Sequence, residues 1–392
     1  IEKGGLPFLF YGVNLCDCVG GGDYVLPSRD LLVNEIELNA KAHHLDAMVL
    51  IGTCDKVVPA MLMAAGRVNI PTVIVTGGYM ETPYLDGEHV DFIDIGASIS
   101  KVKEGKMSME KFNELIHVCG PCKGACGMMG TANTMSMLTE TMGMSLPGNS
   151  TTAAVSGKLI NLSREAGRHV MDLWEKNIRP RDIMTADAFE NALTADMALG
   201  CSTNSMLHLP AIANECGIKI DLDMVNQISA RTPNICHLAP AGHAYMEDLN
   251  EAGGIYAVLN ELTKKNLLHT DVMTVTGKTM AENIKGCINK NTDIIRPIDQ
   301  PYSETGGIAV LKGNLAPNRC VVKRSAVAKE MLVHKGPAKV FNSEEEAIAA
   351  ITGGKIVKGD VVVIRYEGPA GGPGMREMLS PTSAIAGMGL DK

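Results

Sequence analysis

The chain has 392 residues, more than a single hydrophobic core usually serves, so two domains are expected. Its formal net charge is −8 and it has no basic block, which argues against a nucleic acid or an anionic membrane as partner. No apolar run approaches the length of a transmembrane helix. The number of cysteines, eleven, is odd. They are better explained as reduced thiols or metal ligands of a cytosolic protein than as a disulfide framework.

Strands and helices alternate at the start of the chain. The apolar residues 6–13 predict a first strand, and a helix is expected from about residue 28 to residue 44. A second strand is expected at 47–51, a helix after Pro59, and a third strand at 73–78. This order implies a parallel sheet with right-handed crossovers.

The pattern then becomes helical and finally β-rich. Helices are predicted over 131–142 and over most of 151–267. Short β runs between Gly, Pro and Asn turns follow at 272–275, 308–311, 321–324, 339–341 and 361–366, with one helix at 343–352. The predicted fold class is α/β. A parallel-sheet domain with a large helical part, residues 1–280, precedes a β-rich, barrel-like domain, residues 281–392, that looks incomplete.

The end of the second predicted strand carries three polar side chains in a row, Cys54, Asp55 and Lys56. Ligands of open α/β sheets bind at the carboxyl ends of the strands. A soft thiolate beside a hard carboxylate suggests two different inorganic partners. The alternative is a surface Asp–Lys pair after a strand, with a buried structural cysteine.

A second cysteine-rich loop contains Cys119, Cys122 and Cys126. A structural zinc site normally needs two paired halves, and no second CxxC lies elsewhere. An iron–sulfur cluster, in contrast, can draw single cysteines from distant loops. Cys54 and Cys126 both lie on glycine-flanked loops expected at the edge of the sheet. The sequence supports a group of buried free thiols about equally well.

Oxygen ligands for a hard cation form a third set. Asp17, Asp55 and Glu377 follow apolar strands on loops, and Mg²⁺ prefers such carboxylates. Lys56 cannot ligate as an ammonium, but as a carbamate it would offer two anionic oxygens. Taken singly, each acid is better explained as a solvated loop residue. The glycine-rich loop 367–378 could wrap an anion or form a tight turn, and it matches no nucleotide-binding pattern.

Several long stretches together resemble the dihydroxy-acid and sugar-acid dehydratase family, and the match runs through nearly the whole chain. They are Thr53-Cys-Asp-Lys56, Gly124-Ala-Cys-Gly-Met-Met-Gly-Thr-Ala-Asn-Thr-Met135, Gly143-Met-Ser-Leu-Pro-Gly148, Met197-Ala-Leu-Gly-Cys-Ser-Thr-Asn204, Arg231-Thr-Pro-Asn-Ile-Cys236, Pro301-Tyr-Ser-Glu-Thr-Gly-Gly307, and Arg365-Tyr-Glu-Gly-Pro through Ser380-Pro-Thr-Ser383.

The resemblance implies an iron–sulfur cluster, 2Fe-2S or 4Fe-4S, with Cys54 and Cys126 among its ligands. It also implies that Mg²⁺ is held by Asp17, Asp55, carbamylated Lys56 and Glu377. The family's fold is an α/β domain followed by a β-barrel, assembled as a homodimer. Its reaction removes water from a 2,3-dihydroxy acid: a base takes the C2 proton, the C3 hydroxyl leaves, and the enol tautomerises to a 2-oxo acid.

The resemblance also bears on the substrate. The last residues look more like those of branched-chain dihydroxy-acid enzymes of valine and isoleucine biosynthesis than like sugar-acid enzymes. A branched 2,3-dihydroxy acid is therefore the expected substrate, and an aldonate or phosphogluconate is the alternative within the family. A non-catalytic metal-binding relative and a zinc-stabilised binding module are alternatives from other classes.

The chain departs from the family pattern in three places. The loop after Asp17 is shorter, richer in glycine, and lacks the usual histidine. The third cluster cysteine of the family belongs to an N-terminal segment that this chain does not show. The family's catalytic serine follows the segment that ends here at Lys392, so the resemblance assigns no catalytic residue within the chain. We therefore expect the native polypeptide to extend past Ile1 and Lys392, and these residues alone to be inactive.

Overall fold

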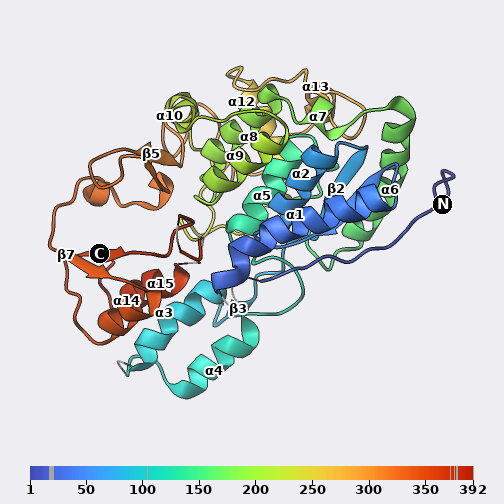
Figure 1. Cartoon of the computed structure of the whole chain (residues 1–392). Helices are drawn as coiled ribbons and strands as arrows, with labels where there is room; N and C mark the ends of the chain where they lie inside the picture. The colour runs from blue at the N-terminus through green and yellow to red at the C-terminus, as the bar shows by residue number, and fades with distance from the viewer. Residues whose placement is uncertain (17–21, 104, 371, 375, 377, 392) are drawn as a thin grey trace. The chain divides into compact units, whose positions relative to one another are not determined.

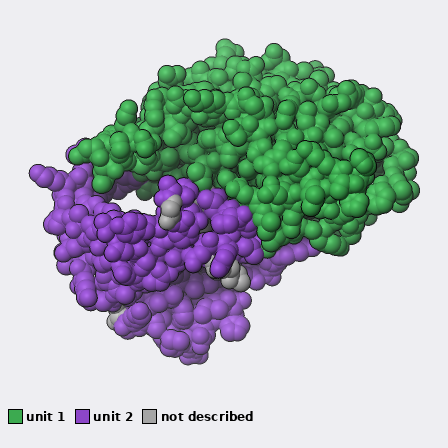
Figure 2. Space-filling view, viewed as in Figure 1, with its two compact units in different colours: residues 1–14, 29–79, 124–326 green, residues 15–28, 80–123, 327–392 purple. Residues whose placement is uncertain are grey.

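The structure is a computed structural model that describes residues 1–16, 22–103, 105–370, 372–374, 376 and 378–391 (Figure 1). Asp17 and Glu377, two of the predicted metal ligands, lie outside the described residues. The chain divides into two compact units, coloured in Figure 2. Unit 1 comprises residues 1–14, 29–79 and 124–326, and unit 2 comprises residues 15–28, 80–123 and 327–392. The predicted domains 1–280 and 281–392 stay a prediction.

Unit 1 contains a small parallel sheet. Strand β1 (Met48–Gly52) pairs in parallel with β2 (Thr72–Thr76), so that Gly52 lies opposite Thr76. Helix α2 (Val57–Val68) connects them, and its Ala- and Met-rich sequence is buried from Val57 to Gly66. Because a parallel pair needs a crossover rather than a tight turn, the buried α2 is the expected connection. Both predicted strands and their parallel order are confirmed.

The predicted strand at residues 6–13 is wrong, since no strand is assigned among the described residues before β1. β2 instead has a neighbour in a later segment, where the Ile74 N–H donates to the carbonyl of Met144 at 2.9 Å. The apolar residues 6–11 have a composition that is compatible with a strand. However, Leu9 and Tyr11 remain exposed, and composition alone does not specify a pairing partner.

Helices form most of the rest of unit 1, as predicted, and pack around a core rich in methionine. They are α1 (Val25–Ala42, with residues 29–42 in unit 1), α5 (Thr131–Thr141), α6 (Gly157–Lys176), α7 (Pro180–Ile183), α8 (Ala186–Leu199), α9 (Ser205–Glu215), α10 (Leu222–Arg231), α11 (Met246–Glu251), α12 (Gly254–Thr263) and α13 (Met280–Ile284). No helix among the described residues is both long and apolar enough to cross a membrane.

The predicted β-rich region supplies strands to both units. In unit 1, β5 (Ala309–Leu311) and β6 (Cys320–Val322) form an antiparallel pair, followed by the 3₁₀ turn η2 (Arg324–Ala326). The Asn226 amide of α10 binds the backbone N–H and carbonyl of Val310 at 2.9 and 2.8 Å. This double contact attaches β5 to the helical part. The run at 272–275 forms only an isolated bridge, between Met273 and Thr279.

Unit 2 pairs β7 (Ala338–Phe341) in parallel with β8 (Val361–Ile364), with α14 (Glu344–Thr352) between them in the chain. Ser343 caps α14 by accepting a hydrogen bond from the Glu346 N–H, and the acidic residues that follow suit a helix N-terminus. A strand–helix–strand unit therefore stands where a barrel was predicted, and no closed barrel is present among the described residues. The other elements are η1 (Gly22–Tyr24), β3 (Tyr84–Leu85), β4 (Glu88–His89), α3 (Phe92–Lys103), α4 (Met109–Val118), η3 (Lys329–Leu332) and α15 (Leu379–Gly387).

Candidate functional site

The loop after β1 is held against the continuation of β2. The Gly77 N–H donates to the carbonyl of Gly52 at 2.9 Å, so the pairing extends one residue past β2. A Cβ at Gly77 would lie 1.8 Å from the Thr53 hydroxyl oxygen, which only glycine avoids. Cys54 then adopts a φ of +88°, a left-handed conformation uncommon for a residue with a side chain. Such strain clusters at functional sites, which supports the prediction of a site at this turn.

The cysteine-rich loop reaches the same end of the sheet. The Ala125 N–H donates to the carbonyl of Gly78 at 2.9 Å, and Ala125 forms a parallel bridge with Tyr79. The Asn133 amide of α5 fixes the loop further, because it donates to the carbonyls of Cys126 and Met128 at 2.6 and 2.7 Å. Cys54 and Cys126 therefore follow segments at the same end of the sheet, and both are partly exposed. Their role as cluster ligands stays a prediction.

Asp55 and Lys56 are buried, with exposed fractions of 6% and 1%. This excludes the alternative of a surface Asp–Lys pair. The Lys56 Nζ lies 3.2 Å from Oδ2 of Asp55, and the Asn204 amide nitrogen lies 3.5 Å from the same oxygen. The His208 Nε2 lies 3.4 Å from Oδ1. Among the described residues, Lys56, the α9 N-cap Asn204 and His208 of the first turn of α9 therefore contact this carboxylate.

His208 is a neutral donor to Asp55. Its Nδ1 lies 3.2 Å from Nη1 of the buried Arg29. A guanidinium can only donate, so Nδ1 accepts, the ring proton is assigned to Nε2, and Nε2 donates to the carboxylate. Burial lowers the pKa of His208, and the opposing effect of Asp55 is smaller. Arg29 and His208 thus orient the carboxylate without placing a second full charge directly against it.

Asn204 connects Asp55 to the cysteine-rich loop. Its amide nitrogen donates to the Thr131 hydroxyl at 2.9 Å, and Thr131 is the first residue of α5, directly after that loop. The Thr131 and Ser202 hydroxyls lie 2.9 Å apart. The Asp55 carboxylate and the cysteine-rich loop therefore share one hydrogen-bond network.

Sequence reasoning missed Arg29, Thr131, Asn204 and His208 as site residues. Asn204 belongs to a stretch that resembles the dehydratase family, but nothing in the sequence alone joined it to Asp55. One signal was available. Asn204 and His208 are four residues apart at the start of a helix, and residues at that spacing share a face.

The residues present suit the implied groups in chemical kind. Cys54 and Cys126 are soft donors for iron, and Asp55 is a hard donor for a cation such as Mg²⁺. Within the described part of the chain, no three His, Cys, Asp or Glu side chains lie close enough to hold an ion together. The predicted Mg²⁺ set includes Asp17 and Glu377, which are not described, so both complete ligand sets stay predictions.

The other two cysteines of the loop, in unit 2, have different surroundings. The Cys119 thiol donates to the carbonyl of Asp91, with its Sγ 3.2 Å from that oxygen, and Cys122 accepts from the Glu81 N–H at 3.4 Å. Burial, with smaller contributions from Asp94 and Asp91, raises the pKa of Cys119 to about 12. Cys119 is therefore a neutral thiol near pH 7, which agrees with its hydrogen bond to a backbone carbonyl.

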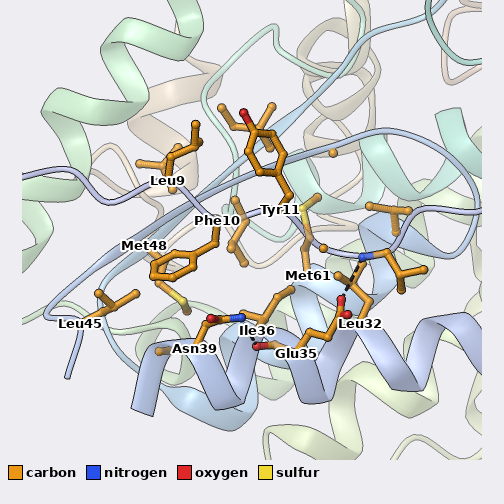
Figure 3. A pocket seen from close by; sticks show the side chains of 18 of the residues that line it. Leu9, Phe10, Tyr11, Leu32, Glu35, Ile36, Asn39, Leu45, Met48 and Met61 are labelled. Carbon is orange, nitrogen blue, oxygen red and sulfur yellow. Dashed lines mark hydrogen bonds between the residues drawn. The ribbon is translucent and has the colours of Figure 1, made fainter. Parts of the chain in front are cut away.

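A cavity of about 500 Å³ lies between residues 8–14, α1 and β1 (Figure 3). Phe10 points toward Met48, whereas Tyr11 points away from α1. The Glu35 carboxylate accepts from the Val13 N–H at 2.9 Å. None of the three side chains of the Cys54–Lys56 turn is among the lining residues, so this cavity is separate from the candidate site.

Comparison with known proteins identifies the family of the chain. Two family profiles match the chain: "Dihydroxy-acid/6-phosphogluconate dehydratase N-terminal" over residues 1–283 and "Dihydroxy-acid/6-phosphogluconate dehydratase C-terminal" over residues 293–392. The chain is 60% identical to a dihydroxy-acid dehydratase of Clostridium kluyveri, 58% to one of Clostridium beijerinckii and 59% to one of Lachnoclostridium phytofermentans. Each comparison covers 99% of this chain and 70% of the relative. The chain belongs to the dihydroxy-acid/6-phosphogluconate dehydratase family.

Proposed function

We propose that this protein is a hydro-lyase that converts a 2,3-dihydroxy carboxylic acid into a 2-oxo acid. The observation that carries the proposal is the identity of 58 to 60% to dihydroxy-acid dehydratases over 99% of the chain. The burial of Asp55 and Lys56 beside Cys54 supports it, because a buried carboxylate and a thiol are donors suited to inorganic groups of the kind that this family uses. In the reaction the C2–H bond breaks to a base, the C3 hydroxyl leaves, and the enol tautomerises.

Cys54 and Cys126 are proposed as two ligands of an iron–sulfur cluster, of 2Fe-2S or 4Fe-4S type. Bound iron and Mg²⁺ would supply Lewis acidity for the departing hydroxyl and positive charge for the substrate carboxylate and the developing enolate. The protein contributes the placement of the thiols. Gly77 lets the β1 loop approach closely, and Asn133 fixes the loop that carries Cys126.

Asp55, Lys56, Asp17 and Glu377 are proposed as the Mg²⁺ ligands, with Lys56 as a carbamate. Carbamylation joins the neutral amine to CO₂ and releases one proton. Asp55 and an ammonium sum to zero charge, whereas Asp55 and a carbamate sum to −2, so carbamylation gives this pair the negative charge that attracts a divalent cation. His208 and Asn204 donate to Asp55, which orients its oxygens and leaves the cation as the source of balancing positive charge.

The substrate is proposed to be a branched-chain 2,3-dihydroxy acid of valine and isoleucine biosynthesis, and an aldonate or 6-phosphogluconate is the alternative. The names of the relatives favour the first. The native polypeptide, purified anaerobically and supplied with Mg²⁺, should form a 2-oxo acid from 2,3-dihydroxy-isovalerate faster than from an aldonate at the same concentration. Turnover of the aldonate alone would contradict the substrate proposal, and turnover of neither would favour a non-catalytic metal-binding relative.

We further propose a homodimer that acts in the cytoplasm. The soft thiol ligands support a reducing compartment, because cysteines must stay reduced to hold iron. Light scattering of the purified protein should give twice the mass of one chain. A monomer at micromolar concentration would contradict the dimer.

A further inference from the structure

The start of helix α9 is anchored by a buried carboxylate that the proposed chemistry does not use. Asp196, near the end of α8, is fully buried. Its Oδ2 accepts a hydrogen bond from the Ser205 hydroxyl at 2.7 Å. Ser205 is the first residue of α9 and directly follows Asn204, whose amide nitrogen lies 3.5 Å from Asp55. One hydrogen bond therefore joins Asp196 to the segment that surrounds Asp55.

The same hydroxyl organises the turn before α9. Ser205 Oγ also lies 2.7 Å from the carbonyl of Ser202, and the Asn204 N–H donates to the Ser202 hydroxyl at 3.3 Å. Ser202 in turn contacts Thr131 at 2.9 Å. The turn is thus held at both ends, by Asp196 at Ser205 and by Thr131 at Ser202. A shift of Ser205 would move Asn204 and, one helical turn later, His208.

Keeping Asp196 in this position is costly for the fold. Burial raises its pKa to about 7, while Ser205, Cys201 and Lys323 offset only part of the effect. The positive charge of Lys323 contributes to this offset, and burial lowers the pKa of Lys323 in turn. Buried charged pairs often stabilise less than apolar residues of the same shape. A role in placing α9 accounts for a carboxylate where an apolar side chain would fill the same space.

We propose that Asp196 is a positioning residue for Asp55, acting through Ser205 on the turn that presents Asn204 and His208. The inference rests on the proposed function in one respect, namely that Asp55 binds a divalent cation. It predicts that the hydrogen bond between Asp196 and Ser205, rather than the charge of Asp196, sets the geometry of the cation site.

The affinity of the protein for Mn²⁺ alone tests the proposal without relying on activity. It is measured through the decrease of the EPR signal of free Mn²⁺ as the ion binds. Ser205→Ala removes the donor, Asp196→Ala removes the acceptor, and Asp196→Asn keeps an acceptor oxygen but removes the charge. Thr194→Val is the matched control, because the Thr194 hydroxyl is buried on the same helix and has no hydrogen-bond partner among the residues that the structure describes. Iron content and the circular dichroism spectrum of each variant report whether the rest of the protein is intact.

Ser205→Ala and Asp196→Ala should each weaken Mn²⁺ binding by about tenfold, the size expected for one lost buried hydrogen bond. Asp196→Asn and Thr194→Val should stay within about twofold of the native protein. If Asp196→Ala does not fold, Ser205→Ala decides. Native Mn²⁺ affinity in a folded Ser205→Ala protein, or equal losses of Mn²⁺ affinity in Asp196→Asn and Asp196→Ala, would overturn this inference but not the proposed function. A native protein that binds no Mn²⁺ would overturn the proposed function and the inference with it.

Discussion

Asp55 is surrounded by residues from distant parts of the sequence, which decides how much of the site could be predicted. Cys54, Asp55 and Lys56 are adjacent in the chain and follow a strand, so their grouping was visible in the sequence. His208 lies 153 residues from Asp55, and Arg29 lies 179 residues from His208. Such contacts depend on how helices pack, and a single sequence contains no local signal for them. The supporting residues were therefore found only in the structure.

Asp196 should make stability depend on pH. Its pKa is about 7 in the folded protein and near 3.8 when exposed, so between these values the folded state binds more protons than the unfolded state. The contribution of this group to the free energy of unfolding is therefore greatest below about pH 4, and it falls as the pH rises to about 7. Asp196→Asn lacks this dependence. The free energy of unfolding of this variant, from urea titration, should exceed that of the native protein by a margin that grows from pH 5 to pH 8, by on the order of 2–4 kcal/mol.

If the urea midpoints of the two proteins change in the same way with pH across that range, Asp196 does not titrate there. Thr194→Val again serves as the control, since it should shift the midpoint equally at every pH.

At the level of elements, local signals predicted strand and helix positions better than partners. The pair β1 and β2, the helix α2 between them and the Ser343-capped α14 were all predicted closely. The segment 6–13 is apolar but pairs with no strand among the described residues, and the segment at Met144 lies beside β2 instead. The β runs after residue 300 were located correctly, yet β7 and β8 are parallel and joined by a helix. Pairing is set by long-range packing, which composition does not reveal.

The Asn133 side chain of α5 is expected to hold the loop of Cys126. Asn133→Ala removes the hydrogen bonds to the carbonyls of Cys126 and Met128. The loss of each hydrogen bond should destabilise the loop by about 1 kcal/mol. The variant should fold but release iron faster than the native protein when a chelator is added anaerobically. Ser136→Ala on the same helix removes only a hydrogen bond to the carbonyl of Ala132 and should behave like the native protein. Equal iron release by Asn133→Ala and native protein would contradict this role of the loop contact.

For the molecule as a whole, the family profiles and the compact units divide the chain differently. The C-terminal profile begins at residue 293, whereas unit 1 continues to residue 326 and includes β5, β6 and Lys323. Residues of the C-terminal family region therefore pack with the helices that place Asp55, and Lys323 acts on Asp196. The change from a helical to a β-rich sequence pattern near residue 270 marks a change in the kind of secondary structure. It does not mark the end of the packed unit, because a short antiparallel pair can pack against helices of either region.

Anaerobic analysis of iron, acid-labile sulfide and zinc tests the central claim most directly, namely that Cys54 and Cys126 hold an iron–sulfur cluster beside a separate hard-cation site at Asp55. The native protein should contain iron with acid-labile sulfide, Cys54→Ser and Cys126→Ser should lose both, and Asp55→Asn should keep them. Cys236→Ala, which alters a fully buried thiol outside these two loops in the sequence, should also keep them. Zinc without sulfide in the native protein, or full iron in both Cys54→Ser and Cys126→Ser, would contradict the claim.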